Sequence, residues 1–297
     1  MITTFSAMRQ SFLAKAAIIG ALLLALSGCS ALRLVYGNSP QLAWWWVDGY
    51  FDFSSEQTPR AKAAIDRLFE WHRGTQLAEY TGVLAAAAVQ ITEPTTPLDA
   101  CQWQRRLRDL VEPALDKSLE VGADLVPTLG EAQFRHLEER FATQRTEMRE
   151  KFLQPSLEDR RKAAMKRTVE RVEQLYGGIG DAQRRVIQAG LAASPFDPEA
   201  WFAERERRQK DTAQTLRRLV AEKASRDQIV AAMRTLVERT ERSPDPAYRA
   251  YQDRLADYNC AFAAQIHDAT TPAQRASARD RLKGWEADLR SFLAPAG

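Results

Sequence analysis

The sequence predicts an all-α protein, an elongated multi-helix bundle of about eight to ten antiparallel helices that follows a signal peptide. Helix starts recur as a capping residue followed by proline, a pair that suits the first helical turn. Between these starts, apolar residues recur at spacings of three and four, as on one face of a helix. No segment shows the alternation and hairpin turns of strands. Because the breaks are short, we expect sequential helices to pack antiparallel.

Residues 1–28 have the order of a bacterial lipoprotein signal peptide. Arg9 and Lys15 precede an uncharged apolar run at 16–25, which is shorter than the roughly 20 residues that span a bilayer. LSGC at 26–29 resembles the lipobox, in which the cysteine is acylated, so we expect lipidation at Cys29. By resemblance to Gram-negative lipoproteins, Ser30 after that cysteine implies the periplasmic face of the outer membrane. The alternative is an ordinary signal peptide with a chance cysteine.

An aromatic segment follows within residues 29–54, before a helical periplasmic domain at 55–297. The stretch LAWWWVDGYFDF contains Trp44, Trp45 and Trp46, which are candidate binding residues. The rings either lie among lipid headgroups or pack against the helical body, which we favour. Successive helix positions point about 100° apart, so we expect two rings to be buried and one to be more exposed.

Capping residues, prolines and glycines mark the helix boundaries in the remaining chain. Starts are predicted at Thr58-Pro59, Thr96-Pro97, Asp197-Pro198, Ser243-Pro244 and Thr271-Pro272. Breaks are predicted at Gly74, at TEPTT (92–96), near Pro155, at YGGIG (176–180), at ASPFDP (193–198) and at ERSPDP (241–246). The alternative at Pro155 is that the helix near 129–153 continues with a kink to about 175, since apolar residues resume at Leu157.

Two charged stretches depart from this pattern. ERERRQKDTAQ (204–214) has no large apolar residue, so it is either an exposed helix held by charge pairs, which we favour, or the lining of a polar groove. A basic cluster with acids among its residues is either a solvated face, which we favour, or a surface for lipid phosphates. Its members are Arg160, Arg161, Lys162, Lys166, Arg167 and Arg171.

Cys101 and Cys260 are the cysteines beyond the signal region. In an oxidising periplasm, such a pair predicts a disulfide. Both fall in predicted helices, so a bridge would join an early helix to a late one. The alternative is two buried thiols that pack as small apolar groups.

Other chemistry has weak signals. The three histidines, His72, His136 and His267, sit in no metal-binding or catalytic motif. We therefore expect no metal, cofactor or catalytic residue, and a helix-end capping role for His72. Without the leader's two cations, 42 − 2 = 40 Lys and Arg stand against 39 Asp and Glu, which gives no electrostatic case for nucleic acid.

Four helix starts carry a glutamine after a small capping residue. They are FSSEQ (53–57), LGEAQ (129–133), IGDAQ (179–183) and TTPAQ (270–274). The shape resembles helix starts of periplasmic Spy/CpxP-type helical chaperones. Ordinary capping-box chemistry produces it as well, and we favour that interpretation.

A wider resemblance rests on the lipobox, the Tyr-Gly-Asn turn at 36–38, the tryptophan run and RLFEWHR at 67–73. On these marks the chain resembles a family of uncharacterised proteobacterial lipoproteins, domain of unknown function 6279. The resemblance implies an all-helical envelope lipoprotein and supplies no activity. We expect a non-enzymatic binding or chaperone-like protein whose partner is an envelope protein or unfolded polypeptide. The alternative is a lipid-handling protein or an enzyme with a site between helices.

Overall fold

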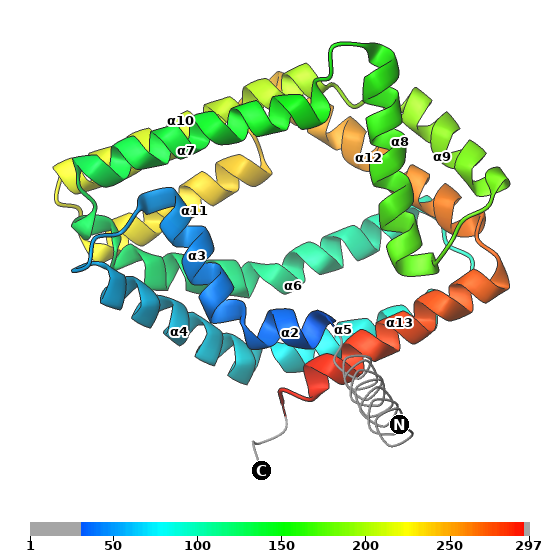
Figure 1. The fold of residues 1–297 in the computed structure, drawn as a ribbon, viewed down its shortest axis with the longest axis horizontal. Helices are drawn as coiled ribbons and strands as arrows, with labels where there is room; N and C mark the ends of the chain where they lie inside the picture. The colour runs from blue at the N-terminus through cyan, green and yellow to red at the C-terminus, as the bar shows by residue number, and fades with distance from the viewer. Residues whose placement is uncertain (1–30, 294–297) are drawn as a thin grey trace, which may run out of the picture. The chain divides into compact units, whose positions relative to one another are not determined.

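The computed structural model describes residues 31–293, and every regular element in that range is a helix (Figure 1). Twelve α-helices lie there, slightly more than the eight to ten expected, because two of them precede residue 55. The helices are α2 (Ala31–Gly37), α3 (Ser39–Phe51), α4 (Thr58–Thr75), α5 (Leu77–Gln90), α6 (Pro97–Ala123), α7 (Glu131–Phe152), α8 (Leu157–Tyr176), α9 (Asp181–Ala193), α10 (Pro198–Ala221), α11 (Arg226–Glu241), α12 (Pro246–Asp268) and α13 (Pro272–Arg290), with a 3₁₀ turn, η1, at Val126–Thr128.

The described chain divides into two units, residues 31–39 and a unit that begins at Pro40. The first holds α2, whose Leu34 carbonyl accepts a hydrogen bond from the Asn38 side chain at 2.8 Å. The second holds the remaining helices. The aromatic segment is therefore packed together with the helical body from Pro40 onward.

Helix packing follows distant parts of the sequence more than neighbouring ones. The most extensive contacts join α5 to α13 and α6 to α12, and α13 lies along α5 in Figure 1. Some sequential pairs do pack together, such as α8 with α9 and α10 with α11. The expectation that sequential helices pack antiparallel is thus correct only in part, because short loops also allow a helix to turn away from its predecessor.

Several predicted boundaries are confirmed and others shift. Thr96, Asp197 and Thr271 are N-caps whose side-chain oxygens accept backbone N–H groups of the first turn. The cap of α12 is Asp245, two residues after the expected Ser243, and Thr58 lies inside the first turn of α4 instead of capping it.

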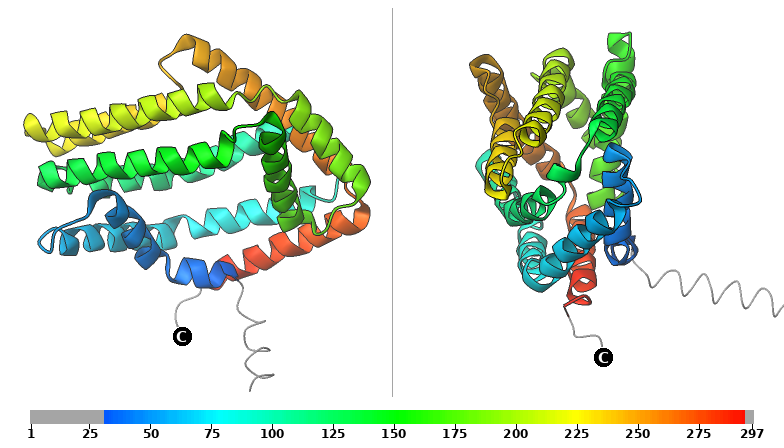
Figure 2. Two further views of the ribbon diagram at one scale, coloured as in Figure 1. Left: turned by 45° about the horizontal axis from the view of Figure 1, so that its top comes forward. Right: turned by 90° about the vertical axis from the view of Figure 1, so that its left-hand side faces the viewer.

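The break near Pro155 is confirmed, and the alternative of a kinked, continuous helix is wrong. α7 ends at Phe152 and α8 starts at Leu157, with the Ser156 hydroxyl accepting the Asp159 N–H at 3.0 Å. Proline disfavours a helical conformation at Gln154, and the new cap then starts an independent helix. α8 consequently runs in a different direction from α7 (Figure 2).

Two hydrophobic cores hold the larger unit. One gathers α3, α4, α6, α7, α10 and α11, with Leu137 and Ile229 almost fully buried. The other gathers α8, α9, α12 and α13 around Ile187. There α9 approaches α12 so closely that a Cβ at Gly190 would clash with the Phe262 ring. A larger residue at this crossing would therefore force the ring to move.

Candidate functional site

Helix α3 is seated on the first core by one of its three tryptophans. Trp44 packs against that core, 6.0 Å from the Phe53 ring and beneath the Lys62 ammonium. Trp45 and Trp46 are 62% and 66% exposed. The expectation of two buried rings is thus wrong. Trp44, Val47 and Phe51 form the face of α3 that packs against the core. The rings of Trp45 and Trp46 are turned away from that face.

Polar contacts fix the end of α3 to α7. Tyr50 accepts a hydrogen bond from the Gln144 amide, and its ring lies 6.2 Å from Phe141. The His136 ring is 3.3 Å from the Gly49 carbonyl oxygen, where its Nε2 donates. His136, which the sequence left without a role, therefore anchors the aromatic helix.

Beneath α3 lies an apolar cavity of about 510 Å³, here called the chamber. Its walls come from α3, α6, the η1 turn, α10 and α11, helices that surround this region in Figure 1. Apolar side chains dominate the lining: Val47, Phe51, Phe53, Leu115, Leu119, Leu125, Val126, Leu129, Leu216, Met233, Leu236 and Val237. Its polar side chains are Thr212, Thr240 and the exposed Glu241.

A second cavity of about 460 Å³, the polar compartment, adjoins the chamber. Thr212 and Thr240 line both cavities, so the two meet there. The lining of the polar compartment is aromatic and cationic: Trp46, Tyr50, Phe141, Trp201 and Tyr248 together with Gln144, Gln209, Arg205 and Arg208. Burial raises the pKa of the Tyr248 phenol, which keeps that group protonated at neutral pH.

The charged stretch of α10 supplies the polar compartment's floor. Glu204 is only 5% exposed and accepts hydrogen bonds from Arg207 and Arg208 at 2.8–2.9 Å. Burial alone would raise the pKa of Glu204, but these two guanidinium groups bring it below its usual value. The favoured expectation of an exposed helix is therefore wrong for this face, although the expected charge pairs are present.

Arg205 differs from its two arginine neighbours. No carboxylate among the described residues lies within 4.0 Å of its guanidinium, whose Nη2 donates a long hydrogen bond of 3.5 Å to the Gln144 amide oxygen. Its Nε is buried and has no hydrogen-bond partner. No signal in the sequence pointed to this residue beyond the unusual polarity of the stretch at 204–214.

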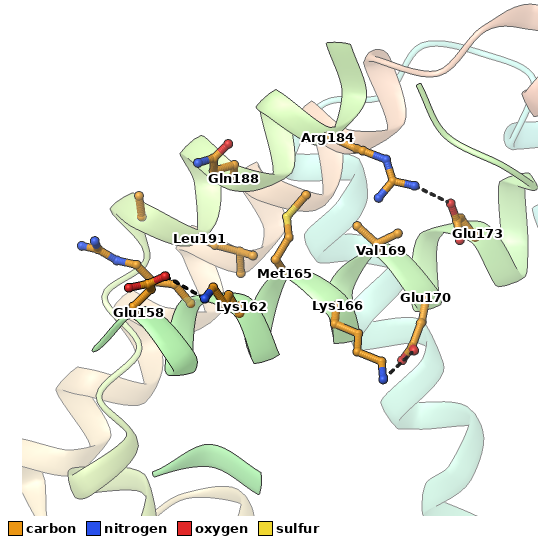
Figure 3. Close-up of a pocket in the computed structure, with 12 residues that line it drawn as sticks. Glu158, Lys162, Met165, Lys166, Val169, Glu170, Glu173, Arg184, Gln188 and Leu191 are labelled. Atoms are coloured by element: carbon orange, nitrogen blue, oxygen red, sulfur yellow. Dashed lines mark hydrogen bonds and ion pairs between the residues drawn. The ribbon is translucent and has the colours of Figure 1, made fainter. Parts of the chain in front are cut away.

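A groove between α8 and α9, of about 840 Å³, holds part of the basic cluster (Figure 3). Met165, Val169 and Leu191 lie between its charged rims. Three of the cations are paired with acids, as Lys162–Glu158 at 2.7 Å, Lys166–Glu170 at 4.0 Å and Arg184–Glu173 at 3.2 Å. Mixed charge beside an apolar floor is thus the character of this α8–α9 groove.

Other predicted residues have structural surroundings. Cys101 of α6 and Cys260 of α12 lie at disulfide distance, with Cα atoms 5.2 Å apart, within the roughly 7 Å that a bridge allows. His267 is buried, and its Nε2 donates to the Glu93 carbonyl, so Nδ1 accepts the Tyr176 hydroxyl at 2.8 Å. Burial raises the pKa of Tyr176 to about 12.

The expectations about membrane attachment and about metal binding concern different parts of the chain. Cys29 lies outside the described residues. Within them, no helix combines the length and the apolar character needed to cross a bilayer. The same residues contain no cluster of three or more histidines, cysteines and acids that could hold a metal ion.

Comparison with known proteins places the chain in a family. Neither the curated proteins nor the solved structures contain a match to it. A family of unknown function, DUF6279, matches residues 49–249, a range that includes the end of α3, the α8–α9 groove and the lining of both cavities except for Trp46 and Val47. The chain therefore belongs to the family of unknown function DUF6279.

Proposed function

We propose that the protein is a membrane-anchored envelope lipoprotein that binds the apolar chain of an amphiphile and performs no chemistry on it. The observation that carries this proposal is the chamber, an apolar cavity of about 510 Å³ with walls from five elements. Binding sites for small molecules are commonly concave, apolar and of about 300–1,000 Å³. The proposal thus joins two expectations from the sequence, a lipid-handling role and a non-enzymatic one.

The site's surroundings support an occupant drawn from a membrane. An acyl group on Cys29 would hold the chamber near a bilayer, where amphiphiles are concentrated. On α3, whose seated face walls the chamber, Leu42, Trp45 and Trp46 form an exposed apolar stripe. Tryptophan is favoured at the headgroup level, so this stripe suits contact with the membrane surface.

A chain-length series tests the proposal. The acylated protein is placed in phosphatidylcholine vesicles with alkyl alcohols that carry a photoreactive diazirine, and labelled residues are mapped by mass spectrometry. A buried CH₂ contributes about 0.8 kcal/mol, or about fourfold in affinity. Labelling of α6, α10 and α11, corrected for partitioning into the vesicles, should rise with chain length until the chamber is full.

A matched pair of substitutions locates the binding. Val237→Trp fills the chamber and should abolish this labelling. Val111→Trp, at an exposed position of α6 outside the chamber lining, should leave it unchanged. Scattered labelling that ignores chain length and both substitutions would exclude the chamber as a binding site.

The α8–α9 groove favours a second candidate function, chaperone-like binding of unfolded polypeptide. Its apolar floor between mixed charges suits an amphipathic peptide segment. Leu191→Glu should weaken suppression of a client's aggregation several-fold, whereas Leu157→Glu, at an exposed position outside the lining, should not. Equal protection by the wild type and by Leu191→Glu would remove this candidate.

A further inference from the structure

The lining of the polar compartment indicates the chemistry of the proposed ligand's other end. Resting on the proposed function, we propose that this compartment binds an anionic headgroup, a phosphate or a carboxylate, and that Arg205 is its principal cation. The ligand would then be an amphiphile whose apolar chain lies in the chamber and whose negative group lies in the polar compartment.

The arrangement of the two cavities supports this orientation. They share Thr212 and Thr240, so the two cavities are neighbours at these side chains. The hydroxyls of both threonines already donate to their own helices, to the carbonyls of Arg208 and Leu236. Neither hydroxyl proton is therefore left over to compete for the ligand at this boundary.

Charge selects which end of the amphiphile lies there. The acid of the chamber lining is Glu241, which disfavours an anion on that side. In the polar compartment, Arg208 shares the buried Glu204 with Arg207, which offsets part of its charge. Arg205 has no carboxylate partner among the described residues, so it adds an unpaired positive charge to the compartment.

The surroundings of Arg205 are those of a preoriented donor. Its guanidinium lies 5.9 Å from the Trp201 ring centroid and shares the Gln144 amide oxygen with Gln209. Its Nε is buried without a partner. A buried donor without a partner is costly, and an oxyanion that accepts from the guanidinium would offset part of that cost through charge-assisted hydrogen bonds.

Neighbouring groups add neutral donors. The Tyr248 hydroxyl lines the same compartment, and Gln144 links Arg205 to the Tyr50 hydroxyl of α3. Headgroup binding would thus be coupled through Gln144 to α3, the helix that lines the chamber.

Photoreactive hexadecyl probes with different headgroups test the inference. The acylated protein in phosphatidylcholine vesicles receives the alkyl phosphate, carboxylate, alcohol or trimethylammonium, each with the same diazirine at the chain end. For the wild type, labelling of the chamber by at least one anion should exceed that by the alcohol about tenfold or more. The cation should label less than the alcohol. Whichever anion labels more strongly distinguishes a phospholipid-like source from a fatty acid.

Variants separate this inference from the proposed function. Arg205→Gln should reduce the anion-to-alcohol ratio to about one while alcohol labelling persists, and Arg205→Lys should restore part of the preference. Arg218→Gln removes an exposed arginine of the same helix, paired with Glu222, and should behave like the wild type.

Three results would count against a claim. Equal labelling by anions and alcohol in the wild type, or an anion preference that survives Arg205→Gln, overturns the headgroup site and leaves the chamber intact. No chamber labelling by any probe overturns the proposed function and the inference together. Thermal unfolding of each variant verifies that a lost preference does not reflect a lost fold.

Discussion

The side-chain amides of Gln183 and Gln274 hydrogen-bond to each other across the starts of α9 and α13, at 2.6 and 3.2 Å. Each amide oxygen also accepts the N–H of its own helix cap, from Gly180 and Thr271. Each amide nitrogen then reaches the residues before the other helix, at the carbonyls of Ala269 and Gly178. The glutamine therefore does more than close a capping box.

A second junction, between α4 and α7, has the same two kinds of bond from each glutamine, one to its own cap and one to the other segment. Gln57 caps Ser54 and donates to the Thr128 carbonyl, while Gln133 caps Gly130 and donates to the Asp52 carbonyl at 3.4 Å. The four similar starts in the sequence thus form two pairs of helix starts. Ordinary capping accounts for the hydrogen bond that each amide oxygen accepts. It does not account for the hydrogen bond that each amide nitrogen donates to the other segment.

A double-mutant cycle measures the coupling between Gln183 and Gln274. Gln183→Glu keeps the cap acceptor and loses the donor, whereas Gln183→Ala loses both. We expect Ala to lower the free energy of unfolding by about 1–2 kcal/mol and Glu by less. Combined with Gln274→Ala, urea unfolding should give an interaction energy of about 0.5–3 kcal/mol. Strict additivity would show that the two amides act only as caps.

The tryptophans should separate by their burial. Trp44→Ala removes the ring that packs on Phe53 and should lower the free energy of unfolding by up to about 3 kcal/mol. Trp45→Ala should change it by about 0.5 kcal/mol or less, since that ring is exposed. Chemical denaturation of each variant makes the comparison, and a large loss for Trp45 would mean that its ring has a partner in the folded protein.

The cysteine pair should be oxidised in protein recovered from the periplasm. Thiol labelling of denatured, unreduced protein should leave Cys101 and Cys260 unmodified. A bridge across 159 residues contributes about 5 kcal/mol in the chain-entropy model, which is an upper value. Reduction should therefore lower the melting temperature markedly. Full labelling of both thiols before reduction would contradict the bridge.

Membrane attachment should depend on Cys29. Replacing it with alanine removes the proposed acylation site, and the chain should then lose lipoprotein processing, the acyl group and membrane attachment. Metabolic labelling with a palmitate analogue, followed by membrane fractionation, measures both effects. Ser30→Ala is the matched control and should keep the label. A labelled Cys29→Ala protein would show that the anchor lies elsewhere.

Acid should destabilise the protein through His72. Burial lowers the pKa of this histidine below its ordinary value of 6.5, and its ring contacts Tyr80. The unfolded chain therefore binds the proton more readily, so stability is lost as pH falls through about 6.5 toward the lower, folded pKa. Urea unfolding between pH 5 and 8 should show this loss, and His72→Gln should flatten it. An unchanged slope would assign the dependence to other groups.

The helical class and many helix boundaries were predictable because their signals are local in the sequence. Thr96, Asp197 and Thr271 cap their helices through residues within the first turn, which a reader of the chain can see. The pairing of Cys101 with Cys260 was also predictable, because few other cysteines compete.

The site needed tertiary information. α3 has apolar residues on all sides, so the chain alone does not distinguish the face of Trp44 from that of Trp45. Likewise, the burial of Glu204 and the isolation of Arg205 depend on the packing of α7 and α11 against α10, whose stretch at 204–214 has no large apolar residue. Polarity on a helix predicts exposure only when no neighbour covers it.

The pairing of α5 with α13 sets an order of events during synthesis. A chain made from its N-terminus delivers Leu77–Gln90 long before Pro272–Arg290 arrives. Until then, α5 lacks its most extensive helix contact. Such long-range closure slows folding and leaves apolar surface open to wrong partners. The nascent chain thus passes through an incompletely packed stage, and that stage ends only when α13 is delivered.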